Sequence, residues 1–156
     1  MLNIATINKV TSTFEKQYVL HELLKTGTFN VMSRCVNNKT NNGYAVRVAN
    51  VQRLQECELK MLKEEAEILK GIDHVNVMQL YDIHENEEQF VTVAEFLSWG
   101  TLFNSIVRRG VYSKCESARI VLQVTSVLEY LHENGIVHKD MKSGASPHPT
   151  NISRCC

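Results

Sequence analysis

The spacing of the apolar residues changes abruptly within the first half of the chain, and this change limits the folds available to it. Between residues 18 and 49, three apolar segments alternate with two turn-like ones: YVLHELL, KTGTFN, VMSRCV, NNKTNNG and YAVRVA. Such segments predict antiparallel strands joined by hairpins. From residue 53 to 71 the apolar residues recur at helical spacing among Glu and Lys, and Gly71 supplies a stop. We therefore expect a strand meander followed by one amphipathic helix.

The rest of the chain adds two strands and then helices. The segments VMQLYDIH and QFVTVAEFL predict strands on either side of an ENEE turn. TLFNSIVRRG predicts a short helix closed by Gly110. Ser113 and Glu116 form a predicted capping box before a long helix that stops at Asn134–Gly135. From residue 143 onward the composition is that of a turn or linker, so we expect this tail to be disordered.

The composition is that of a globular domain with few specialised features. Of 156 residues, 44% are hydrophobic, and 17 Lys and Arg balance 17 Asp and Glu. Without a basic block, we expect neither a nucleic acid nor a membrane surface as partner. We see no secretory signal and no apolar run long enough to span a membrane, so we expect a cytoplasmic protein. The five cysteines lack C-x-x-C spacing, which predicts reduced thiols.

Five segments in order resemble the calcium/calmodulin-dependent group of protein serine/threonine kinases. They are FEKQYVLHELLKTGTFNVMSRCV, YAVRV, EEAEILKGIDHVNVMQLYD, GTLFNSIVRRGVYS and YLHENGIVHKDMK, and the resemblance runs from about residue 14 to 142. It implies an α+β, protein-kinase-like fold, with a small lobe of five antiparallel strands and one helix and an incomplete helical large lobe. It also implies ATP-dependent phosphoryl transfer to protein hydroxyls. The implied division is an N-terminal extension (1–13), a small lobe (14–97), a partial large lobe (98–142) and the disordered tail (143–156).

The resemblance identifies a glycine turn that would approach the phosphates of ATP. Gly27 corresponds to the second glycine of that turn, and Val31 to the residue that covers the adenine. Lys25 stands at the first glycine position and Asn30 at the third. Lys25 is the larger departure from the family pattern, and it predicts weak or absent ATP binding. An ordinary hairpin turn around Gly27 is the alternative.

Further cofactor-binding positions follow along the small lobe. Ala45 corresponds to the alanine that stacks on adenine, and Arg47 stands where the family has the Lys that grips the α- and β-phosphates. Glu65 corresponds to the helix residue that pairs with this cation. Glu95 to Leu97 would offer backbone groups to adenine. Arg keeps the charge, but its planar fork does not replace a compact ammonium.

The catalytic loop begins as the family pattern requires and then departs from it. Asp140 corresponds to the residue that accepts the proton of the substrate hydroxyl, and Lys142 to the one that neutralises the γ-phosphate. The family's Mg²⁺ ligand, an Asn, is replaced by Ala145, whose methyl group cannot coordinate a hard cation. The second metal-holding motif, Asp-Phe-Gly, does not occur in the sequence. We therefore expect a truncated kinase, from an alternative transcript or a decayed gene copy, without protein ligands for Mg²⁺ and with activity lost or severely impaired.

Two classes of function follow. The first is a protein kinase by lineage, and the alternative is a non-catalytic, pseudokinase-like interaction or decoy protein. The helix 113–134 favours the alternative, because it carries apolar residues on more than one face. We expect it to bind a chaperone or a full-length kinase. Calmodulin is not expected to bind, because no basic amphipathic helix follows the kinase-like region.

Overall fold

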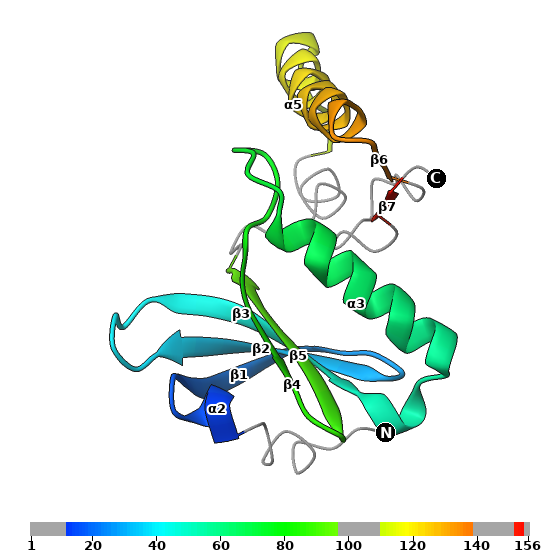
Figure 1. Ribbon diagram of the computed structural model, residues 1–156. Coiled ribbons are helices and arrows are strands. Elements are labelled where there is room, and N and C mark those ends of the chain that lie inside the picture. The colour runs from blue at the N-terminus through cyan, green and yellow to red at the C-terminus, as the bar shows by residue number, and fades with distance from the viewer. Residues whose placement is uncertain (1–11, 97–109, 139–151, 155–156) are drawn as a thin grey trace. The chain divides into compact units, whose positions relative to one another are not determined.

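The computed structural model describes residues 12–96, 110–138 and 152–154 (Figure 1). Two compact units divide the chain: residues 1–66 with 79–96, and residues 67–78 with 97–156. The expected lobe boundary after residue 97 adjoins the division between Phe96 and Leu97. The segment Glu67–Met78, expected in the small lobe, belongs to the second unit. No helix in the described ranges is both long and apolar enough to cross a membrane.

The first unit is built on a five-stranded antiparallel sheet (Figure 1). Its strands are β1 (Tyr18–Thr26), β2 (Asn30–Asn37), β3 (Gly43–Asn50), β4 (Leu80–Glu85) and β5 (Gln89–Glu95), in the spatial order β1-β2-β3-β5-β4. The turn between β2 and β3 is fixed by the Asn37 side chain, which accepts hydrogen bonds from the main-chain N–H groups of Lys39 and Thr40. Asn41 in that turn adopts a φ of 57°, a left-handed conformation that Asn tolerates. The predicted meander is confirmed.

One face of this sheet carries a buried hydrophobic cluster of the first unit. The cluster contains Phe14, Tyr18, Val31, Cys35, Val46, Val48, Val91 and Val93. The short helix α2 (Ser12–Glu15), absent from our expectations, supplies Phe14. The Phe14 ring is fully buried and stacks on Tyr18 with centroids 5.1 Å apart. Packing at this face therefore begins before the first strand.

The helix α3 (Glu56–Lys70) follows the sheet's third strand, but it begins three residues later than predicted. Val51–Arg53 forms a 3₁₀ turn, η1, instead of helix. The Gln55 main-chain N–H then donates to the Glu58 carboxylate at 2.9 Å, which satisfies a donor at the helix start. At the other end, the Gly71 N–H donates to Ile68 O, as the predicted stop requires.

The second unit contains α5 (Lys114–Glu133), whose start confirms the predicted capping box. Ser113 Oγ accepts from the Glu116 N–H at 3.2 Å, and the Glu116 carboxylate accepts from the Ser113 N–H at 2.9 Å. The helix ends at Asn134, where Gly135 adopts a left-handed φ of 68°. Both helix boundaries were readable from local sequence signals.

The second unit also holds a small hairpin-like pair of strands. Strand β6 (Ile136–His138) pairs antiparallel with β7 (Ile152–Arg154). These three residues of the tail bond through their main-chain groups to the edge of β6, and no apolar period in the sequence indicated this pairing. The disorder of the tail stays a prediction. The remainder of the tail and the predicted helix at residues 101–109 lie outside the described residues.

Candidate functional site

The centre of the candidate site is an ion pair between the sheet and α3. Arg47 on β3 places Nη1 3.8 Å from Oε1 of Glu65, and the two side chains are 15% and 14% exposed. This distance is too long for a hydrogen bond, so the pair is held by charge alone. The buried Nε of Arg47 has no hydrogen-bond partner among the described residues. The guanidinium therefore keeps donors for an anionic ligand.

The environment of Glu65 weakens its hold on Arg47. Burial raises the pKa of Glu65 from 4.5 to about 7, and the nearby Arg47 charge opposes this rise only in part. Near neutral pH the Glu65 carboxyl is therefore protonated in a substantial fraction of molecules. At such pH values Arg47 therefore faces an incomplete negative charge in a region with little access to water.

Cross-strand register shows which residues share the Arg47 face of the sheet. Met32 on β2 and Thr92 on β5 lie directly opposite Arg47, so all three project to the side of α3. Val31 precedes Met32 by one residue and packs in the core cluster on the other face. The expectation that Val31 lines one site with Ala45 and Arg47 is therefore wrong. Met32 occupies that place, and sequence analysis missed it.

The glycine turn connects β1 and β2 beside this face. The Gly27 N–H donates to Asn30 O at 2.8 Å, which closes the turn. A Cβ on Gly27 would lie 2.8 Å from Oδ1 of Asn30, so the Asn30 side chain covers the glycine. A side chain at position 27 would therefore require the Asn30 side chain to move. The alternative of an ordinary hairpin turn stays open, because the same contacts would close one.

The row next to Arg47 contains small and charged side chains. Ala45 lies opposite Arg34 on β2 and Ala94 on β5, and both alanines are buried. The Arg34 guanidinium lies 5.3 Å from the centroid of the Phe96 ring and 3.3 Å from the Glu22 carboxylate. The small side chains of Ala45 and Ala94 thus lie in the same cross-strand row as the charged Arg34.

The remaining predicted positions are placed only in part. The Glu95 N–H donates to Gln79 O at 2.9 Å and its side chain is exposed, so this N–H is already used. Leu97 and the catalytic-loop residues Asp140 and Lys142 lie outside the described residues. Their roles stay predictions. Within the described ranges, no group of three or more His, Cys, Asp or Glu is arranged to hold a metal ion.

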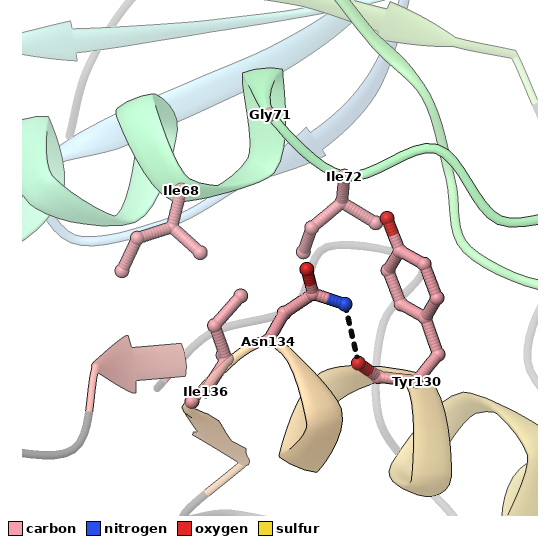
Figure 2. Close-up of a pocket in the computed structure, with 7 residues that line it drawn as sticks. Ile68, Gly71, Ile72, Tyr130, Asn134 and Ile136 are labelled. Carbon is pink, nitrogen blue, oxygen red and sulfur yellow. Dashed lines mark hydrogen bonds between the residues drawn. The ribbon is translucent and has the colours of Figure 1, made fainter.

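The second unit has a cavity of about 310 Å³ (Figure 2). The side chains of Ile68, Ile72 and Ile136 face it together with the Tyr130 ring and Asn134. Asn134 Nδ2 donates to Tyr130 O at 2.7 Å, so its amide is engaged within the wall. No charged side chain lines the cavity. Its chemistry suits an apolar group better than a phosphate.

A family model of the protein kinase domain matches residues 18–145. The chain belongs to the protein kinase domain family. This kinase domain is similar to myosin light chain kinase A of Dictyostelium discoideum, with 36% identity over 128 residues, covering 82% of this chain and 43% of the relative. It is also similar to calcium/calmodulin-dependent protein kinase type II of Caenorhabditis elegans, with 33% identity over 129 residues, covering 83% of this chain and 18% of the relative. Calcium-dependent protein kinase 5 of Plasmodium berghei (strain Anka) is 34% identical over 129 residues, covering 82% of this chain and 23% of the relative.

Family membership confirms the expected lineage and the kinase-like α+β fold of this kinase domain. The chain spans less than half the length of these relatives. Protein kinases use ATP and Mg²⁺, so family membership supports both by lineage. At the position that the resemblance assigns to an amide ligand of Mg²⁺, Ala145 has a methyl group and no side-chain oxygen.

Proposed function

We propose that this kinase domain is a calcium/calmodulin-dependent-type serine/threonine kinase domain that binds ATP weakly and has lost most or all phosphoryl transfer. The observation that carries the proposal is the Arg47–Glu65 ion pair between β3 and α3. ATP would lie on the α3-facing side of the sheet, where Ala45 and Ala94 leave space for an adenine ring. Arg47 would contribute charge to the phosphates.

The weakness of binding follows from the chemistry of Arg47. A guanidinium spreads its charge over a planar fork, whereas an ammonium concentrates it at one point. At 3.8 Å, the Arg47 fork makes no hydrogen bond with Glu65 that would fix its orientation. Ordering the fork on a phosphate therefore costs side-chain entropy, which lowers the net affinity.

The loss of transfer follows from Ala145. We infer that Asp140 still orients a substrate hydroxyl and Lys142 still offers a positive charge. Mg²⁺ would lack the amide oxygen that should hold it beside the phosphates, because alanine has none. Poor placement of the ion removes much of the electrostatic stabilisation on which phosphoryl transfer depends.

Calorimetric titration with ATP, with and without Mg²⁺, tests the binding. We expect measurable binding that Mg²⁺ changes little, and weaker binding by Arg47→Met. The matched control is Arg53→Met, because Arg53 is an exposed arginine of the same unit outside the candidate site. Absence of binding by the unmodified chain, or equal affinity for Arg47→Met, would refute the ATP site.

A peptide-phosphorylation assay tests the loss of activity. The unmodified chain and Asp140→Asn are expected to give the same background. Turnover that Asp140→Asn abolishes would show that Ala145 does not prevent catalysis.

A non-catalytic interaction protein is the second candidate function. Three apolar side chains of α5 favour it: Val121, Leu122 and Val124 are 58%, 68% and 36% exposed. Such surface suits contact with another protein, for which a chaperone or full-length kinase stays our expectation. Sedimentation velocity of the unmodified chain and Leu122→Lys tests it. If both chains sediment as monomers, and both bind added full-length kinase to the same extent, this role is wrong.

A further inference from the structure

Lys25 lies on the same face of the sheet as Arg47. It is the cross-strand partner of Met32, and Met32 is the partner of Arg47, so the three residues form a row across β1, β2 and β3. Directly opposed residues of an antiparallel sheet project to the same side. Two cations therefore flank Met32 on the side where α3 packs.

An irregularity in β1 gives Lys25 this orientation. Leu23 lies opposite Ser33, and regular pairing would then place Lys25 opposite Val31, on the core face. The register shifts between Leu23 and Lys25, so Lys25 pairs with Met32 instead. A one-residue shift turns a side chain to the other face, and such irregularities often re-aim a side chain.

Lys25 is also chemically free. It is exposed, and it forms no ion pair or hydrogen bond with any residue in the described part of the chain. Two carboxylates of the same unit already have cationic partners, since Glu22 pairs with Arg34 and Glu65 with Arg47. Among residues 12–96, 110–138 and 152–154, no carboxylate forms an ion pair with the Lys25 ammonium.

The two cations are spaced for an extended polyanion. Their main chains are about 10 Å apart, since each strand spacing is about 4.8 Å. A nucleotide di- or triphosphate carries several charges along its length, whereas the apolar Met32 between the cations offers none. A compact ammonium suits one phosphate, and a planar fork suits another.

We propose that Lys25 binds a phosphate of the nucleotide and supplies the compact positive charge that β3 lacks. This inference rests on the proposed ATP site and reverses the sequence-based expectation that Lys25 weakens that site. Lys25 on β1 and Arg47 on β3 together bind the phosphates.

Calorimetry with ATP and adenosine on three variants of the full chain tests the proposal. Lys25→Met is expected to weaken ATP binding about tenfold, the typical worth of one charged contact, and to leave adenosine binding unchanged. Lys25→Arg should retain most of the affinity. Lys39→Met removes an exposed lysine from the β2–β3 turn of the same unit and should change neither ligand. Equal melting temperatures would show that the variants fold alike.

The outcomes separate this inference from the proposed function. If the unmodified chain binds ATP and Lys25→Met binds it equally or more tightly, Lys25 is neutral or obstructive, and only this inference fails. If Lys25→Met weakens ATP and adenosine equally, the lysine acts on the shape of the site and the phosphate role is wrong. If the unmodified chain binds neither ligand, the ATP site itself fails, and the role of Lys25 fails with it.

Discussion

Oε1 of Glu65 lies 3.8 Å from Nη1 of Arg47, and neither side chain is more than 15% exposed. Burial of a charge is costly unless a partner and hydrogen bonds compensate for it. Here the partner is present but the hydrogen bond is not. Protonation of Glu65 removes this buried negative charge, and burial accordingly raises the pKa of Glu65.

Glu65→Gln should change how stability depends on pH. The folded-state pKa of about 7 exceeds the ordinary 4.5, so Glu65 holds a proton in the folded chain that it releases on unfolding between these values. The free energy of unfolding of the unmodified chain therefore falls as pH rises through this window. Glutamine does not titrate, so this fall is absent from Glu65→Gln. The free energy of unfolding of Glu65→Gln should therefore rise, relative to that of the unmodified chain, by up to about 3 kcal/mol between pH 4.5 and pH 8.

Urea denaturation at a series of pH values measures this effect. Glu64→Gln is the control, because Glu64 is its exposed neighbour on α3. A constant difference between Glu65→Gln and the unmodified chain across the pH series would contradict the raised pKa.

Arg47→Met should destabilise the chain more at pH 8 than at pH 5. At pH 8 the substitution leaves a buried carboxylate without its cation, and at pH 5 the carboxyl is already protonated. We expect the free energy of unfolding to fall by about 2 kcal/mol at pH 8. This is below the usual range for broken buried ion pairs, because Arg47 and Glu65 are not hydrogen-bonded. Thermal or urea unfolding at both pH values measures it. An equal loss at both would show that only the packing of the Arg47 stem matters.

Tyr130→Phe should loosen the segment that follows α3. The Tyr130 hydroxyl accepts a hydrogen bond from the Asp73 N–H at 3.2 Å, and its ring lies 5.2 Å from that of His74. Phenylalanine keeps the ring contact and removes the acceptor, so we expect a loss of about 1 kcal/mol. Hydrogen exchange at the Asp73 amide should accelerate. Tyr81→Phe, at an exposed tyrosine of the first unit, should leave that amide unaffected.

Cys35 should react with alkylating reagents far more slowly than Cys57 and Cys115. Burial raises the pKa of Cys35 to about 12, so almost no thiolate exists at pH 8, whereas Cys57 and Cys115 are exposed free thiols. Peptide mapping after timed exposure to iodoacetamide measures each rate. Fast labelling of Cys35 in the folded chain would mean that the sheet opens readily at β2.

Local sequence signals were sufficient for much of the fold. Ser113 and Glu116 announce the start of α5 because a capping box involves neighbouring residues only, and Gly135 announces its end. Hairpin turns and the ion-pair partners Arg47 and Glu65 were likewise found at the expected positions. These features depend on short-range chemistry or on a family pattern with fixed spacing.

Orientation within the sheet was harder to predict. Val31 and Met32 differ by one position, yet they face opposite sides, so an error of one residue moves the predicted contact from one face to the other. An alternation count from Arg47 across the β2–β3 hairpin would have selected Met32. The orientation of Lys25 could not be obtained this way, because the irregularity in β1 has no sequence signature that we recognise. Strand β7 is too short for any periodicity.

The register shift between Leu23 and Lys25 makes the length of β1 as important as its composition. Its residues from His21 to Thr26 are exposed, so most substitutions there should be tolerated. Loss or gain of a single codon would have a different effect. It would shift the register of β1, turn Lys25 toward the side where Phe14 packs, and leave Arg47 as the only cation of its row.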